Sequence, residues 1–241
     1  KTAESFCSGP KSVLVGSFIP DHPVAKQLLT ICNLPIAAPS ANISGKPSPT
    51  MADHVWDDLN GKIAGLIDGG QTGVGMESTV VDCTQAFPVI LRPGGVTQEQ
   101  LAEVIDMGPI SYPQREKEGP KGVHKIEKPS APGMKYKHYS PEVPLWIVEG
   151  GAEKLQTIIN EALTDQKKVG VLASEKMAKA LKADKTVSLG VSLNEIAVNL
   201  YDGLRSFRYH DVDLIVCEAF PEEGIGVAIM NRLNKAASKH L

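Results

Sequence analysis

This sequence of 241 residues lacks long apolar runs, and it lacks a strong excess of charge of either sign. No apolar run approaches the roughly 20 residues that a membrane-spanning helix needs. Residues 1–20 do not combine a basic segment with a long apolar one, as a secretory leader does. The formal net charge is only -3, so no global basic field draws the protein onto nucleic acid. We therefore predict no membrane association and no bulk binding of RNA.

Paired cysteines are also missing. The four cysteines (Cys7, Cys32, Cys83 and Cys217) are spread along the chain, without a CxxC pair and without histidines at metal-binding spacing. This pattern is typical of reduced thiols in a cytoplasmic protein. It predicts a cytoplasmic location and no structural zinc site. A GxGxxG fingerprint is lacking as well, so a bound dinucleotide is not expected.

What is present is an α/β pattern in two parts. With 42% hydrophobic and 22% charged residues, the chain is expected to form two modest domains. Short apolar strands alternate with helical segments in both halves, which indicates α/β layers. In the first half we expect strands at 12–16, 35–38, 65–67, 79–82 and 89–91, and helices at 24–32 and 51–59. In the second half we expect strands at 145–148, 168–173, 186–189 and 213–218, and helices at 152–164, 175–183, 193–207 and 226–239.

The predicted domains are residues 1–108, a linker at 109–142, and a small parallel, Rossmann-like three-layer unit at 143–241. The linker is rich in Pro, Gly, Lys and Glu and has neither helical nor strand periodicity. It is too long for a simple connection, so it is either disordered or functional. The chain does not begin with Met, and Lys1 opens what looks like a strand-bearing region, so we expect that an N-terminal segment is missing.

Three motifs in the first half carry polar or flexible residues next to expected strands. PSANISGKPSPT (39–50) could hydrogen-bond a compact polar ligand, or it could be an ordinary turn that caps the next helix through Ser48 or Thr50. DGGQTGVGMESTVVD (68–82) has four glycines in seven positions, which suits either anion capture or a hairpin. In ILRPGG (90–95), Arg92 is either a phosphate ligand or a solvated charge.

Together and in this order, the three motifs resemble the YrdC-type domain of threonylcarbamoyl-AMP synthases. Two further segments extend the resemblance to the longer, two-domain members of that family: SAPGMKYKHYSP (130–141) in the linker and AIMNRLNKAA (228–237) in the closing helix. The resemblance runs from about Pro20 to the C-terminus. It implies a twisted-sheet domain with a positively lined cavity, a linker that folds back over it, and a Rossmann-like C-terminal domain.

The resemblance also implies a reaction. L-threonine and bicarbonate (or CO2) form N-carboxy-threonine, whose carboxylate attacks the α-phosphate of ATP to give threonylcarbamoyl-AMP and pyrophosphate. Partner proteins then transfer the threonylcarbamoyl group to tRNA. The chain would thus be a nucleotidyltransferase that uses ATP, with Mg2+ bridging the phosphates.

Several residues match positions that contact substrates in the family. The resemblance implies that Ser40 and Ser78 bind L-threonine, that Asn42, Thr50 and Arg92 bind ATP, and that Tyr136 closes over the nucleotide. The attacking group belongs to the substrate, so no catalytic nucleophile and no protein-held metal are assigned. The protein's work would be positioning and charge neutralisation.

This sequence departs from the family pattern at two places. Phe18 stands where the family has an arginine, two residues before Pro20. The family's upstream Lys-x-Arg stretch, which would contact threonine and triphosphate, does not occur in the sequence. A molecule that starts at Lys1 is therefore expected to show little or no catalysis.

Two other functions compete with a synthase. One is a truncated, non-catalytic YrdC-type module that binds nucleotide or RNA. The other is the carbamoyl-transfer relative of hydrogenase maturation, which should carry zinc-finger-like Cys motifs that this sequence does not have. The Lys-rich segment 117–137 is either a solvated linker or a weak tRNA contact.

Overall fold

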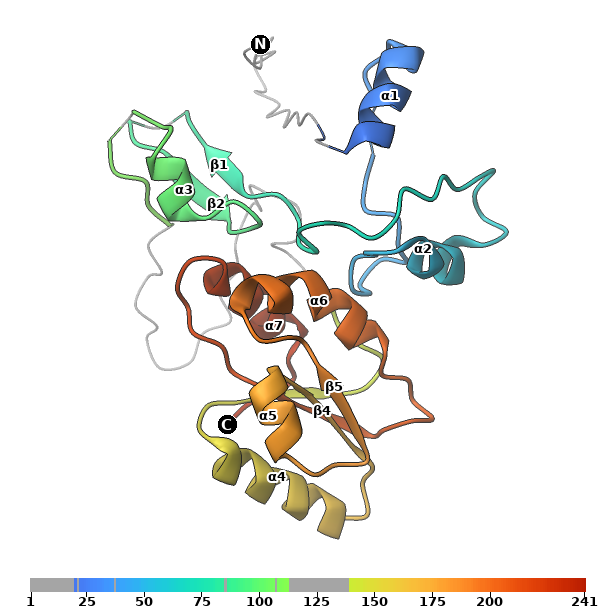
Figure 1. Ribbon diagram of the computed structural model, residues 1–241, viewed down its shortest axis with the longest axis vertical. Helices are drawn as coiled ribbons and strands as arrows, with labels where there is room; N and C mark the ends of the chain where they lie inside the picture. Colours follow the sequence, from blue (N-terminus) through green and yellow to red (C-terminus); the bar gives the residue numbers. More distant parts are fainter. Residues whose placement is uncertain (1–19, 21, 37, 85, 107, 113–138) are drawn as a thin grey trace, which may run out of the picture. The chain divides into compact units, whose positions relative to one another are not determined.

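The computed structural model describes residues 20, 22–36, 38–84, 86–106, 108–112 and 139–241 (Figure 1). The chain divides into two compact units, residues 1–39 and residues 40–241. In the first unit, helix α1 (Pro23–Cys32) begins with a proline, whose fixed φ suits the first helical position. It ends at Asn33, which adopts a left-handed conformation with φ 47° and donates its N–H to the Leu29 carbonyl. This confirms the helix predicted at 24–32.

The second unit opens with short elements that confirm the helix predicted at 51–59 and the strands predicted at 79–82 and 89–91, and that add an unpredicted helix, α3 (Gln98–Ala102). They are α2 (Ala52–Leu59), β1 (Val80–Asp82), β2 (Val89–Arg92) and α3. Strands β1 and β2 form an antiparallel pair with an irregularity between Val80 and Val81. Helix α3 starts with a reciprocal capping box between Thr97 and Gln100.

Two predicted strands are wrong. No strand forms at the described residues 35, 36 and 38, or at 65–67. A strand needs a hydrogen-bonded neighbour as well as an apolar sequence, and these segments pair with no described strand. Their apolar side chains are exposed, including Ile36 and Ile67. The strand predicted at 12–16 lies outside the described residues.

The C-terminal part is an α/β layer structure, as predicted. Five strands form one parallel sheet in the order β5-β4-β6-β3-β7. Strand β6 lies between β4 and β3, whereas the first two strands are neighbours in the dinucleotide-binding fold. The elements are β3 (Leu145–Val148), α4 (Ala152–Thr164), β4 (Val169–Ala173), α5 (Glu175–Ala180), β5 (Lys185–Ser188), α6 (Leu193–Arg205), β6 (Leu214–Glu218), α7 (Gly226–Ala236) and β7 (Lys239–His240).

Alternating strand residues supply the two cores on either side of this sheet. Ile147 and Ile215 face α6 and α7, where they pack with Leu200 and other apolar residues. On the opposite face, Val148 and Val216 pack in the core that includes residues of α4. Figure 1 shows α6 and α7 on one side of the sheet and α4 and α5 on the other. Within the described residues, no helix has both the length and the apolar character that crossing a membrane requires.

Candidate functional site

The loop before α2 contains three of the residues predicted to bind substrates: Ser40, Asn42 and Thr50. The Asn42 side-chain amide donates to the backbone oxygens of Ile43 (2.9 Å) and Lys46 (3.2 Å), which fixes the turn. Its Oδ1 atom is buried and accepts no hydrogen bond. Ser40 is exposed. The expected helix cap is wrong, because Met51 occupies that position without a side-chain bond.

Thr50 is 2% exposed and is held by His54. Its backbone N–H donates to His54 Nδ1 at 3.2 Å, so this nitrogen is the unprotonated one. The proton is therefore on Nε2, which lies 3.1 Å from Asp202 Oδ1 on α6. Burial and the nearby Arg205 charge lower the pKa of His54, although Asp202 opposes them. A neutral His54 thus joins the Thr50 backbone to α6.

Glu77 is the centre of a hydrogen-bonded cluster, which we call the Glu77 node: Ser48, Glu77, Tyr201 and Arg232. Oε1 of Glu77 accepts from Ser48 Oγ at 2.7 Å. Oε2 accepts from Tyr201 Oη at 2.7 Å and from Arg232 Nε at 2.9 Å. Burial alone would raise the pKa of Glu77, but the Arg232 charge and the hydrogen bonds outweigh it and lower the pKa. Glu77 is therefore ionised at neutral pH.

Arg92, Arg232 and Lys235 form a cationic cluster beside this node. Arg92 Nη2 donates to the Ser78 carbonyl at 2.8 Å, which ties it to the residue after Glu77. Arg232 is fully buried and lies over the Tyr139 ring, 5.4 Å from its centroid. Burial and the charges of Arg232 and Arg92 lower the pKa of Lys235 to about 8. Glu77 thus pairs directly with Arg232, while Arg92 is bonded to the backbone of the residue after Glu77.

Among the residues that the structure describes, four buried side-chain atoms have no hydrogen-bond partner: Asn42 Oδ1, Arg92 Nε, Ser140 Oγ and Arg232 Nη2. Buried polar atoms are nearly always paired with protein, water or ligand, because an unpaired one costs about 1–3 kcal/mol. Two of the four belong to predicted ATP ligands, Asn42 and Arg92. Within the described part of the chain, these four atoms are therefore the buried side-chain atoms that could form a hydrogen bond with a polar ligand.

Glycines let the backbone segments of this region approach closely. Gly75 has φ +71°, and a Cβ there would lie 2.4 Å from the Val198 backbone of α6. A Cβ at Gly94 would lie 2.3 Å from the Glu77 carbonyl. The Gly-rich motif is expected to serve either anion capture or a hairpin. Neither role explains Gly75, whose lack of a side chain allows close packing against α6.

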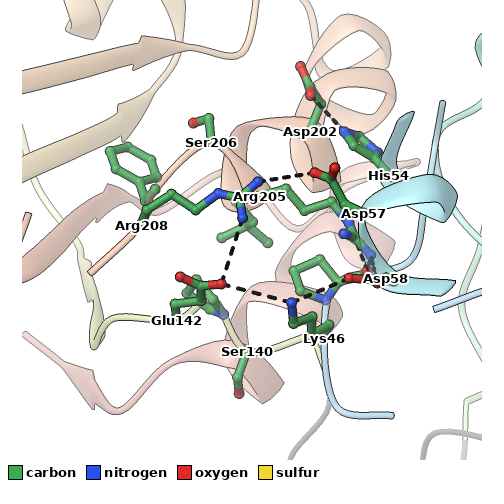
Figure 2. A pocket seen from close by; sticks show the side chains of 14 residues that line it. Lys46, His54, Asp57, Asp58, Ser140, Glu142, Asp202, Arg205, Ser206 and Arg208 are labelled. Atoms are coloured by element: carbon green, nitrogen blue, oxygen red, sulfur yellow. Dashed lines mark hydrogen bonds and ion pairs between the residues drawn. The ribbon is translucent and has the colours of Figure 1, made fainter. Parts of the chain in front are cut away.

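A cavity of about 250 Å3 lies between α2 and α6 (Figure 2). Its charges are mutually paired. Asp58 accepts from Arg205 at 2.7 Å and from Lys46 at 3.3 Å, and Asp57 pairs with Arg208 at 3.2 Å. Arg205 also donates to the Pro47 carbonyl, at 2.6 and 3.0 Å. This paired arrangement fixes the loop before α2 to α6, and it leaves little free charge for a ligand.

The structure describes some of the predicted site residues but not all of them. It brings Arg92 to the Ser78 backbone and keeps Asn42 and Thr50 on one loop. Tyr136, like Phe18, lies outside the described residues. Sequence reasoning missed the roles of several residues because their partners are far away in the chain: Glu77, Arg232 and Lys235, which lie in motifs it had identified, and His54 and Tyr201, which do not.

Comparison with known proteins gives consistent matches. The family described as "Threonylcarbamoyl-AMP synthase, C-terminal domain" matches residues 96–238, and the family described as "Telomere recombination" matches residues 4–94. A threonylcarbamoyl-AMP synthase of Bacillus subtilis (strain 168) is 52% identical over 222 residues, which are 91% of this chain and 62% of the relative. The corresponding protein of Pyrococcus abyssi is 43% identical, with the same two shares covered.

Solved structures agree. The crystal structure of P. abyssi Sua5 complexed with L-threonine has a TM-score of 0.76 and 41% sequence identity, covering 92% of this chain and 64% of that one. A double-alanine variant of the same protein gives a TM-score of 0.79, with the same identity and coverage. The chain thus spans somewhat less than two thirds of the length of these relatives.

Proposed function

Because the chain belongs to the threonylcarbamoyl-AMP synthase family, as its motifs predict, we propose that it takes part in the synthesis of threonylcarbamoyl-AMP from L-threonine, bicarbonate and ATP. In this reaction a carboxylate oxygen of N-carboxy-threonine attacks the α-phosphorus of ATP. The bond from that phosphorus to the bridging oxygen breaks, and pyrophosphate leaves. The product would pass to tRNA-modifying partner proteins in the cytoplasm.

The observation that carries this proposal is the free hydrogen-bonding capacity of two predicted ATP ligands. Asn42 Oδ1 and Arg92 Nε are both buried without a partner. An amide oxygen accepts hydrogen bonds, as from the amino group of a base, and a guanidinium N–H donates to phosphate oxygens. Ser40 and Ser78, both exposed, would bind threonine, and Tyr136 would close over the nucleotide.

Magnesium would come with the nucleotide. Among the described residues, no group of three or more His, Cys, Asp or Glu side chains is placed to hold a metal. The residues therefore do not form a protein cage for Mg2+, which commonly binds through phosphate oxygens and water. The part that this chain's own residues play is binding, orientation and neutralisation of charge.

The test is pyrophosphate release by the purified chain, and by the same chain extended at its N-terminus to the length of its relatives, with and without L-threonine and bicarbonate. We expect release that depends on both substrates in the extended chain. Loss of release in the chain of 241 residues would locate essential ligands upstream. If neither chain responds to threonine, the enzyme proposal fails, and the non-catalytic nucleotide- or RNA-binding module is favoured.

A matched pair of variants tests the role of Arg92. We expect Arg92→Gln to lower kcat/KM for ATP by about 10- to 100-fold, since a hydrogen bond to a charged group is lost. Arg208→Gln is the control, because Arg208 is 44% exposed and its contact with Asp57 is a surface ion pair. Equal effects of the two substitutions would contradict an ATP-binding role for Arg92.

A further inference from the structure

Helix α7 presents two basic side chains, Arg232 and Lys235, to the Glu77 node. They lie three residues apart, so they share one side of the helix. Arg232 reaches Glu77 directly, with its Nε 2.9 Å from Oε2. Burial and the charges of Arg232 and Arg92 lower the pKa of Lys235, and the charge of Glu77 opposes them. The C-terminal domain thus contributes positive charge to the region that contains the predicted ATP ligand Arg92.

This positive charge exceeds what docking of α7 requires. Among the described residues, Glu77 is the carboxylate that pairs with Arg232, and it also accepts hydrogen bonds from Ser48 and Tyr201. In the described part of the chain, Lys235 forms no ion pair with a carboxylate, and Arg92 bonds to a backbone carbonyl only. Like charges held together without a counter-ion are costly. An anion in this region would remove that cost.

Hydrogen-bond donors point to the kind of anion. Arg232 uses Nε for Glu77 and Nη1 for Asn231 Oδ1, which leaves Nη2 buried without an acceptor. Arg92 uses Nη2 for Ser78 and leaves Nε buried without an acceptor. Lys235 adds an ammonium group with three donors. Two guanidinium groups and an ammonium suit an anion with many oxygens and more than one negative charge.

We propose that Arg232 and Lys235 of α7, together with Arg92, form a subsite for the pyrophosphate group of ATP, so that the C-terminal domain binds the leaving group of the reaction. This inference rests on the proposed function and deepens it. When the bond between the α-phosphorus and the bridging oxygen breaks, negative charge develops on the departing pyrophosphate. Cations fixed beside it favour that state. Arg232 has a second role, because it also holds α7 against Glu77. The only role proposed for Lys235 is to bind the anion.

Calorimetric titration of the 241-residue chain with inorganic pyrophosphate, inorganic phosphate and AMP tests the subsite. We expect Lys235→Met to weaken pyrophosphate binding by about 10-fold or more, as for a lost charge-assisted bond, and to leave AMP binding within about twofold. Lys182→Met is the matched control, because Lys182 is exposed and lies after α5, in a segment that packs on the opposite face of the sheet. Arg232→Lys, which keeps the charge on Glu77's partner, should also weaken pyrophosphate binding. Circular dichroism verifies that each variant is folded.

Each outcome is decisive. Selective loss of pyrophosphate affinity in Lys235→Met, with the control unchanged, supports the subsite. Unchanged affinity in that variant, or no pyrophosphate binding by the unmodified chain, overturns it. Equal weakening of phosphate, pyrophosphate and AMP would indicate a general field effect and would also overturn it. The proposed function is tested separately by threonine-dependent turnover, so AMP binding and turnover that survive a failed subsite would leave that function standing.

Discussion

Removing the charge of Lys235 should make the folded protein more stable at neutral pH. The pKa of Lys235 falls from 10.5 to about 8 on folding, through burial and the charges of Arg232 and Arg92. A fall of that size corresponds to roughly 3 kcal/mol at pH 7, since each unit is worth about 1.4 kcal/mol. The side chain is partly solvent-exposed, and we therefore expect solvent screening to reduce this to about 1–2 kcal/mol. Lys235→Met should raise Tm by about 2–6 °C at pH 7 and low salt.

The sign of the pH dependence separates this effect from simple apolar burial. Because the folded pKa is lowered, the unfolded chain holds more protons between pH 8 and 10.5. The stability of the unmodified protein should therefore rise across this interval, and the advantage of Lys235→Met should shrink to about a quarter at pH 10. Added methyl packing would give an advantage that does not change with pH.

Thermal unfolding followed by circular dichroism at pH 7 and pH 10, with Lys182→Met as the control, is the assay. The control should shift Tm by less than about 2 °C, as exposed substitutions do. A Tm for Lys235→Met that equals or falls below that of the unmodified chain at pH 7 would refute the reasoning, and so would an advantage that persists at pH 10. With pyrophosphate present, the unmodified chain should gain more stability than the variant.

Three further substitutions probe the node and its surroundings. Glu77→Gln should cost about 3–5 kcal/mol in urea unfolding, because it leaves the buried Arg232 charge unpaired, and a cost under 1 kcal/mol would contradict the node. Because the pKa of His54 is lowered on folding, its contribution to stability is present above pH 6.5 and is lost as the pH falls below that value. In His54→Gln, the free energy of unfolding measured in urea should therefore change less between pH 7 and pH 5 than in the unmodified chain. Gly75→Ala should cost about 2 kcal/mol or more in the same assay, through overlap with α6 and positive φ. Gly73→Ala, where nothing lies within 4 Å of the added carbon, should change stability little, and equal costs for the two alanines would count against close packing at Gly75.

The parallel sheet could be predicted from the sequence because its strands are continuous apolar runs. Residues 169–173, for example, are all buried between two helical layers, so each position is apolar or glycine. The same local signal predicts strands at 35–38 and 65–67, but the described residues 35, 36 and 38 and residues 65–67 form none, since pairing depends on distant partners. The end of α7 also differs. The predicted helix ran to Lys239, but Ala237 is extended and Lys239 pairs with β3 as a short edge strand.

The motifs proposed to bind substrates could be identified from the sequence, whereas the contacts between the two halves could not. Turn-forming and hydroxyl residues at 39–50 are a local signal. The pairing of Glu77 with Arg232 joins residues 155 positions apart, and nothing in a single sequence connects them. A polar signal did exist, because Arg232 interrupts the apolar side of α7 that packs against the sheet. The position of Arg232 in the sequence therefore indicates a buried positive charge, but it does not show which residue pairs with that charge. The domain limits at 108 and 142 stay predictions.

The long separation within the Glu77 node has a consequence for synthesis on the ribosome. At about 5–20 residues per second, roughly 8–30 seconds pass between the appearance of Glu77 and that of Arg232. Tyr201 arrives 124 residues after Glu77, also late. During that interval the nascent chain cannot bury the Glu77 carboxylate without a large desolvation cost. The segment around Glu77 should therefore stay hydrated until α7 is made, and it should reach its final packing only after that helix has been synthesised.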